Sequence, residues 1–201
     1  MQARNYTIQS ASLADIPSML GFEKKYFDAC WQADPALIDK LIHQDPMMFR
    51  LCKKEDTLKG YYGVMALPYQ YWDGLLKGSI EEAEALQHTI PFEDPDSYLY
   101  IFSLIVDMED AEHKQYTRAL IRDFARQYIF DEGERKPHFN AAGAFTVSAG
   151  GTHIVERSGF DYLGSFPGGN GEYVKSYAIK RQRLIQYARQ NCQCRSQSQQ
   201  K

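Results

Sequence analysis

The residues best suited to chemistry lie where a long apolar stretch meets a charged turn, in the segment SYLYIFSLIVDMEDAEHKQYTRALIRDFARQYIF at positions 97–130. Its pattern predicts a strand, a tight acidic turn and an amphipathic helix. The first amides of a helix have no partner within the helix and lie at the positive end of its dipole, so such a junction can bind an anion such as phosphate. Glycine usually allows the backbone to approach a phosphate closely, and this segment contains none. Its chemistry therefore depends on how the glycine-free turn meets the helix.

Cysteine and histidine do not form a metal-binding pattern. The four cysteines are Cys30, Cys52, Cys192 and Cys194, and no C-x-x-C pair or nearby histidine completes a set of zinc ligands. The five histidines show no ligand spacing either. We therefore expect no metal site, and free thiols in a reducing compartment.

Charge is distributed unevenly, although the net charge of the chain is only −3. Residues 78–112 contain ten acids and no Lys or Arg, whereas residues 173–201 contain seven bases and no acid. Blocks of one sign usually form solvated faces or tails. The alternative is that the acidic block attracts a cationic substrate such as an amine.

Length and composition predict one soluble, cytoplasmic domain. A chain of 201 residues, 44% hydrophobic and 24% charged, can bury one substantial core but not two ordinary ones. The N-terminal segment has no apolar core of signal-peptide length, and no run approaches the roughly 20 apolar residues of a membrane span.

Apolar periodicity in the N-terminal half predicts a strand, two helices and a hairpin. Ser12 is a candidate N-cap for the first helix, the KKEDT turn joins the two hairpin strands, and Pro68 ends the second of them. We expect a strand at 5–9, helices at 13–27 and 35–43, and strands at 47–52 and 59–67.

The second half begins with a long connection, residues 69–96, in which we expect one or two helical turns. Long connections are uncommon without a function, so this one is a candidate wall or lid beside a substrate, although its aromatic residues can equally pack on the sheet. Residues 98–106 are almost all apolar, as in a central strand buried on both faces. We then expect a helix up to 130, a strand at 144–148, a short helix at 151–158 ended by Gly159, a hairpin at 163–166 and 172–179, and after 180 a helical turn or two before a frayed polar tail.

This order of elements, with four local matches, resembles the GNAT superfamily of acyl-CoA-dependent N-acyltransferases. IQSASLADIPSMLGFEKKYF resembles the family's first strand and helix, and LKGYYGVMALP its third strand. YLYIFSLIVDMEDAEHKQYTRALIRDF resembles the fourth strand, cofactor loop and third helix, and GGTHIVERSGFDYLG resembles the fourth helix and the following strand. The resemblance implies a mixed α/β domain over residues 1–180, with a central twisted sheet of about seven strands, a splayed fourth and fifth strand, and about four flanking helices. Residues 181–201 would form a basic polar tail, partly helical or disordered.

The resemblance also implies where acetyl-CoA or another acyl-CoA would bind as co-substrate. The pantetheine arm would bond to the backbone of Leu104, Ile105 and Val106, and Ser148 stands where the family commonly has a cofactor-contacting asparagine. The pyrophosphate would meet the amides of Glu112, His113, Lys114, Gln115, Tyr116, Thr117 and Arg118. The family's glycine-containing signature aligns with Glu112, Gln115 and Thr117, so none of its positions is retained.

Catalytic candidates follow from the same resemblance. The family's acid tyrosine corresponds to Val155, so the proton chemistry that acyl transfer requires would pass to another side chain. The candidates are Ser148, Tyr100, His153 and Glu23. In structural alternatives, Tyr100 fills the core, His153 faces solvent, and Glu23 pairs with Lys24 or Lys25.

Three functions are compatible with these observations. The first is an N-acyltransferase acting on a primary amine of a small cationic molecule or a protein. The second is a catalytically inactive GNAT-like binding or regulatory module, which the absent glycines, Val155 and Ser148 favour. The third, nucleic-acid binding through the basic C-terminal block, lacks any base-reading motif. No membrane partner is expected.

Overall fold

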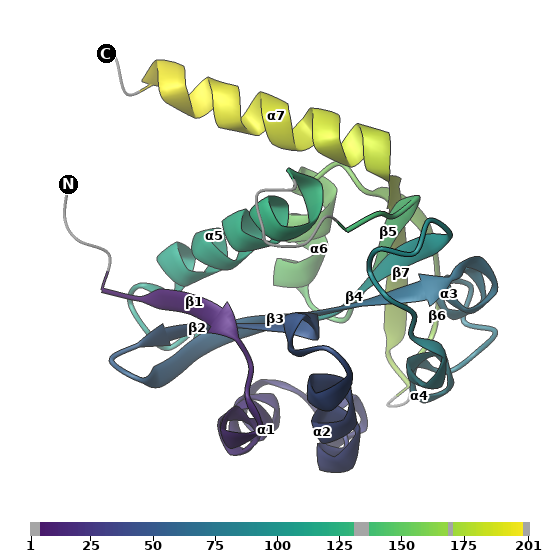
Figure 1. The fold of residues 1–201 in the computed structure, drawn as a ribbon, viewed down its shortest axis with the longest axis horizontal. Helices are drawn as coiled ribbons and strands as arrows, with labels where there is room; N and C mark the ends of the chain where they lie inside the picture. Colours follow the sequence, from purple (N-terminus) through teal and green to yellow (C-terminus); the bar gives the residue numbers. More distant parts are fainter. Residues whose placement is uncertain (1–4, 131–136, 169–170, 199–201) are drawn as a thin grey trace. The chain divides into compact units, whose positions relative to one another are not determined.

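The computed structural model describes residues 5–130, 137–168 and 171–198, with side chains up to residue 190 (Figure 1). The strands are β1 (Thr7–Ser10), β2 (Phe49–Lys54), β3 (Thr57–Pro68), β4 (Ser97–Val106), β5 (Ala141–Thr146), β6 (Asp161–Pro167) and β7 (Tyr173–Lys180). The helices are α1 (Ile16–Tyr26), α2 (Pro35–Gln44), α3 (Tyr69–Leu76), α4 (Glu82–Ala85), α5 (His113–Phe124), α6 (Ala149–Arg157) and α7 (Arg181–Ser198).

The strands of the described residues form one mixed sheet in the order β1-β2-β3-β4-β5-β7-β6. The outer pairs are antiparallel, and β4 runs parallel to β5. The predicted mixed α/β class and seven-stranded sheet are confirmed. The described residues form seven α-helices, where about four flanking helices were expected.

The chain divides into two compact units, and the division falls within β3 and β4. The first unit contains the chain up to Val64 together with Phe102–Asp123. The second contains Met65–Ile101, Phe124–Gly168 and the chain from Glu172 onward.

In the first unit, α1 and α2 lie on one face of the strands and α5 lies on the other (Figure 1). Met19 of α1 and Leu41 of α2 are buried, as is Phe49 of β2. The Phe49 ring meets the ring of Phe102 edge-on, with 5.2 Å between centroids. Burial of one apolar stripe on each helix accounts for the helical periodicity of the sequence.

A buried ion pair fastens α5 to β2. The Arg50 guanidinium donates from Nε and Nη2 to the two carboxylate oxygens of Asp123, at 2.9 and 3.1 Å, and only about a tenth of either side chain is exposed. Tyr62 also donates to Asp123, at 2.9 Å, and Arg50 donates to Ser10 at 2.9 Å. Bidentate geometry and these additional hydrogen bonds are what a buried pair needs to offset its desolvation.

The second unit packs α3 on β5 through a glycine. A Cβ added to Gly143 of β5 would lie 2.6 Å from Leu76 Cδ1 and 2.9 Å from Trp72 Nε1, so the helix approaches the strand where no side chain intervenes. The Trp72 indole donates to the Leu99 carbonyl at 2.8 Å. The connection 69–96 therefore begins with an eight-residue helix packed on the sheet, which is more structure than the expected turn or two.

The β2–β3 hairpin is tighter than the KKEDT turn predicted. Lys54 pairs with Thr57, and only Glu55 and Asp56 form the turn, both with positive φ (50° and 62°), as in the two-residue turns that suit hairpins. Cys52 pairs with Gly60 while Lys53 pairs with Leu58, so Lys59 is an extra residue in β3 and forms a β-bulge.

The C-terminal segment forms one helix, α7, through residue 198, where a short helix and a frayed tail were expected. No Gly or Pro interrupts this segment, and its first turns pack on the fold. Leu184 is buried, and the Tyr187 ring lies against Gly159, whose φ of +82° ends α6 as predicted.

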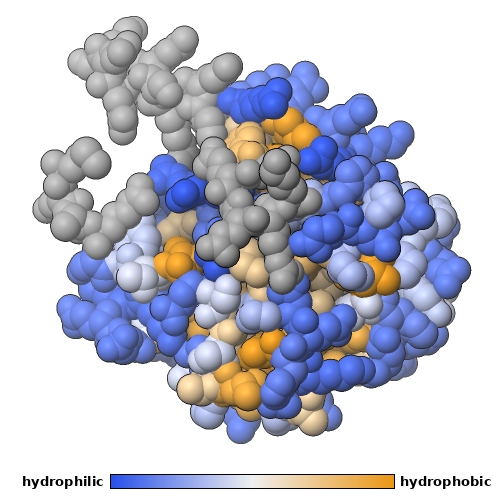
Figure 2. Space-filling view, viewed as in Figure 1, coloured by the Kyte–Doolittle hydropathy of each residue, from blue (hydrophilic) through white to orange (hydrophobic). Residues whose placement is uncertain are grey.

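The face in Figure 2 is mostly hydrophilic, with apolar side chains in small groups. Among the described residues, none of the helices is long and apolar enough to cross a bilayer.

Replacing Asp123 with Asn should lower the free energy of unfolding by about 3 kcal/mol, because Arg50 would keep its buried charge and lose its carboxylate. The control is Asp39→Asn, which removes an exposed acid of α2 paired with His43 and should change stability by less than about 0.5 kcal/mol. Urea unfolding followed by circular dichroism measures both. Equal effects of the two substitutions would show that the Arg50–Asp123 pair does not stabilise the fold.

Candidate functional site

The parallel pairing of β4 with β5 is short. It joins Leu99 with Ala142, Tyr100 with Gly143 and Ile101 with Ala144, whereas β4 continues to Val106. The predicted arm-binding residues Leu104, Ile105 and Val106 all follow the last of these pairs.

The amides at the start of α5 already have acceptors from their own chain. The Glu112 amide donates to the Asp110 carboxylate at 2.8 Å, and the His113 amide donates to the Asp110 carbonyl at 3.0 Å. Gln115 and Tyr116 donate to the Glu112 carbonyl at 2.7 and 3.3 Å. Four of the amides that the resemblance assigns to a pyrophosphate are therefore bonded within the turn, and this part of the chain does not fit the phosphate groups of CoA.

Three lysines from earlier elements neutralise the acids of this turn. Lys59 lies 2.9 Å from the carboxylate of Asp110, and Lys54 forms an ion pair with Glu112. Each ammonium donates a hydrogen bond that holds the pKa of its carboxyl partner below the ordinary value, and the pKa of each lysine is raised in return. The third, Lys25 of α1, pairs with Asp107 at 3.2 Å and Glu109 at 2.7 Å.

Two tyrosines complete the cluster formed by these acids and lysines. Tyr26 of α1 donates to Asp107 at 2.7 Å and accepts the Met108 amide at 3.1 Å. Tyr116 is fully buried, donates to Glu112 at 3.1 Å, and meets the Tyr6 ring edge-on. Burial and the bond to Glu112 raise the pKa of Tyr116. Four of the ten acids at 78–112 are thus engaged by lysines, which leaves a weaker acidic surface than the sequence implies.

The remaining α5 residues that were predicted to bind the pyrophosphate are more exposed than Tyr116. Lys114, Gln115 and Arg118 are exposed, and the Thr117 hydroxyl donates to the His113 carbonyl at 2.9 Å.

Glu23 is a buried acceptor rather than an available base. Its two carboxylate oxygens accept the Tyr61 hydroxyl at 2.6 Å and the Ala33 amide at 2.7 Å. Burial, and then the Glu23 carboxylate, raise the pKa of Tyr61 well above its ordinary value. Glu23 thus joins α1, the α1–α2 connection and β3, and Lys25 pairs elsewhere.

Tyr100 belongs to the second unit and has a carboxylate partner that the sequence did not indicate. Its hydroxyl donates to Glu82 of α4 at 2.9 Å, and its buried ring meets Phe145 edge-on. Burial, and then Glu82, raise the pKa of Tyr100 well above its ordinary value, so the phenol stays protonated at neutral pH. Nothing in the spacing of residues 82 and 100 indicates this contact.

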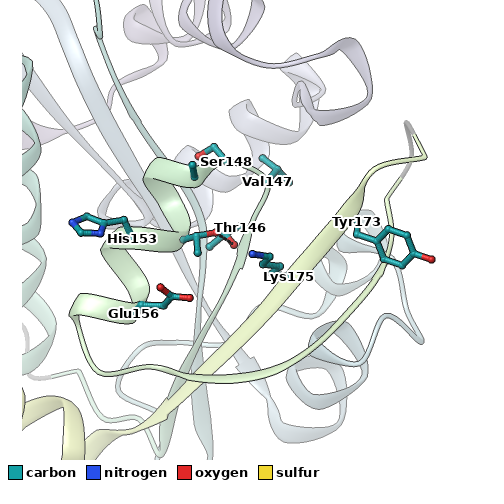
Figure 3. A pocket seen from close by; sticks show the side chains of 9 residues that line it. Thr146, Val147, Ser148, His153, Glu156, Tyr173 and Lys175 are labelled. Carbon is teal, nitrogen blue, oxygen red and sulfur yellow. Dashed lines mark hydrogen bonds between the residues drawn. The ribbon is translucent and has the colours of Figure 1, made fainter.

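Ser148 and His153 line one pocket of about 400 Å³ in the second unit, with Thr146, Val147, Ala149, Thr152, Glu156, Tyr173 and Lys175 (Figure 3). Ser148 is the N-cap of α6, and its hydroxyl accepts the Gly151 amide at 3.1 Å. The His153 ring points away from Lys175 (Figure 3), so the pocket contains both candidates without bringing their functional groups together.

At the family's tyrosine position, Val155 is buried and can take no part in proton transfer. A nearby tyrosine comes from β7 instead: Tyr177 donates to Glu156 at 3.0 Å, and burial, followed by this bond, raises its pKa. Sequence reasoning missed this pair because its members lie on different elements. The described residues hold no group of His, Cys, Asp and Glu that could bind a metal.

No protein-family model and no curated protein matches the sequence. Solved structures do match. The loading GNATL domain of CurA from Lyngbya majuscula superposes with a TM-score of 0.67 at 12% identity, covering 88% of this chain and 98% of that chain. The GNAT-like decarboxylase GphF, in complex with isobutyryl-CoA, has a TM-score of 0.66 at 11% identity over 87% and 99%. Ard1 from Thermoplasma volcanium has a TM-score of 0.61 at 14% identity over 88% and 97%.

The charge cluster at α5 predicts a pH dependence of stability. Glu112→Gln should destabilise the protein at neutral pH, and the difference from the wild type should shrink as pH falls below about 5. The pKa of Glu112 is lower in the folded protein than its ordinary value of 4.5. The ionised carboxylate therefore stabilises the fold above pH 4.5, and this stabilisation is lost as the pH falls through the lower pKa of the folded state. Urea unfolding between about pH 7 and pH 3 measures the difference.

The matched control is Glu109→Gln, which removes the same charge from a side chain that is 75% exposed and should have less effect on stability throughout. A Glu112→Gln effect that is constant over this pH range would contradict the ion-pair explanation.

Proposed function

Because the chain has the GNAT fold, we propose that it is an N-acyltransferase that moves an acyl group from acetyl-CoA, or a related acyl-CoA, to a primary amine. The observation that carries the proposal is the end of the β4–β5 pairing at Ile101 and Ala144, while β4 continues to Val106. The GphF structure, with isobutyryl-CoA bound, supports an acyl thioester as the ligand of this fold. At identities of 11–14%, these comparisons support the fold, and the activity is our inference.

In this proposal the backbone of Leu104, Ile105 and Val106 bonds to the amides of the pantetheine arm. A strand segment beyond its last pairing can offer N–H and C=O groups on one edge, and an extended ligand with amides can bond to them as another strand would. Side-chain identity matters little for this interaction, which agrees with the simple apolar sequence of these positions.

The reaction joins the amine nitrogen to the thioester carbonyl carbon and breaks the C–S bond. The amine must lose a proton and the leaving thiolate must gain one. We assign the proton-donor role to Tyr100, because it is a phenol that lies one residue before the last β4–β5 pair, and its hydroxyl would turn from Glu82 to the leaving thiolate. Ser148 and His153 remain candidates for the other proton transfer, while the two bonds of Glu23 favour a structural role for it.

We propose a cationic small molecule or a protein amine as the acceptor. The acids of residues 81–96 support this proposal, because negative charge attracts a cationic amine. The acids of the β4–α5 turn do not add to this attraction, since lysines neutralise them. The alternative, an inactive binding or regulatory module, is favoured by the occupied amides at the start of α5.

Acetyl-CoA should bind in calorimetry, and an amine panel should then give amine-dependent release of free thiol. Tyr100→Phe should lower kcat by about 10²–10⁴-fold if the phenol donates a proton. The control is Tyr162→Phe, which removes the hydroxyl of an exposed tyrosine bonded to Ser165 and should leave kcat unchanged. Binding without thiol release from any amine would favour the inactive module, and no binding at about 1 mM ligand would overturn the proposed donor.

A further inference from the structure

The start of α5 is closed to phosphate by the chain's own carboxylates. We infer that this protein recognises its thioester donor through the pantetheine arm alone, and that Asp110 and Glu112 exclude the donor's phosphates from this turn. The inference rests on the proposed function, because it defines the chemical class of its donor: an acyl thioester of pantetheine, to which a nucleotide adds no affinity.

The amides at the start of α5 are already bonded within the chain. A phosphate bound at a helix start accepts hydrogen bonds from amides that have no other acceptor. Here the Asp110 carboxylate accepts the Glu112 amide and the Asp110 carbonyl accepts the His113 amide. An incoming phosphate would have to displace a carboxylate that is held in place by Lys59 at 2.9 Å.

The charge of this turn also opposes a phosphate. Lys54 and Lys59 are the cations nearest to these carboxylates, and both are in ion pairs with them. A diphosphate would meet two carboxylates before it met an available ammonium from either lysine. Lys114 and Arg118 are exposed on α5, where water and salt weaken their attraction for a phosphate.

Packing holds the turn as well. Tyr116 lies between Gln115 and Thr117, two positions of the aligned signature, and its buried hydroxyl donates to Glu112 at 3.1 Å and lies 3.5 Å from Asp110. Its ring also contacts Tyr6. The turn is therefore fixed from the inside by a side chain that cannot move outward without exposing an aromatic ring.

The test compares acetyl-CoA with S-acetyl-pantetheine, which has the arm and no phosphate, by calorimetry on the full chain. We expect the wild-type affinities to agree within about threefold. In Asp110→Asn/Glu112→Gln, Lys54 loses its ion pair with Glu112, and Lys59 loses its nearer partner and keeps only Asp107, at 3.6 Å. Acetyl-CoA should therefore bind at least about tenfold tighter than to the wild type, while the affinity for the pantetheine thioester is unchanged. Raising the salt concentration should remove this gain, because it is electrostatic.

The control is Glu109→Gln. It removes one negative charge from the same turn, at a side chain that pairs with Lys25, and should alter the affinity for neither ligand. Circular dichroism verifies that each variant is folded. If the double variant does not fold, Asp110→Asn alone is used, because asparagine retains an oxygen for the Glu112 amide and leaves Lys59 with Asp107 as its acidic partner, at 3.6 Å.

The outcomes separate this inference from the proposed function. Wild-type protein that binds acetyl-CoA at least about tenfold tighter than the pantetheine thioester overturns the inference and leaves the acyltransferase proposal standing. If the wild type binds neither ligand, the proposed donor and its recognition through the arm are both wrong, and the double variant then decides only whether Asp110 and Glu112 exclude phosphate. Acetyl-CoA binding gained only in that variant supports exclusion by Asp110 and Glu112, and no gain overturns it.

Discussion

The first amides of an α-helix have no acceptor within the helix, and at the start of α5 the chain supplies acceptors itself. Asp110 accepts the amides of Glu112 and His113, and the Glu112 carbonyl accepts those of Gln115 and Tyr116. Lysines of the first unit balance the charge of this turn. Lys59 balances Asp110, Lys54 balances Glu112, and Lys25 reaches the preceding acids from α1. The β4–α5 turn thus joins α1 and the β2–β3 hairpin by charge, at a position where a glycine-rich turn would leave backbone open to a ligand.

The candidate side chains differ in how much of their hydrogen-bonding capacity the fold has used. Glu23 has bonds to both carboxylate oxygens, which makes it part of the scaffold. Ser148 serves as a helix cap, although its exposed hydroxyl can still donate. Tyr100 donates to Glu82 close to Ile101 and Ala144, where β4 ceases to pair with β5. The hydrogen bonds of these side chains therefore distinguish catalytic candidates that residue type alone does not.

Much of the fold could be predicted because it depends on local patterns. The apolar run before Val106, the turn at Gly159 and the prolines at 35 and 68 all mark element boundaries close to their observed places. Charge partners could not be predicted, because Lys54 and Glu112 are 58 positions apart and nothing local relates them. The same holds for Glu82 with Tyr100. The length of α7 was missed because its C-terminal half is polar and has no apolar periodicity, although no Gly or Pro interrupts it.

The β-bulge at Lys59 has a consequence for how this chain could change over evolutionary time. The extra residue, Lys59, is also the one whose ammonium pairs with Asp110. Removing the bulge would therefore remove the ion pair as well. Deleting it would shift the register by one position and turn the following side chains of β3 to the opposite face. The length of the hairpin between Lys54 and Gly60 is therefore tied to a helix that begins more than fifty residues later.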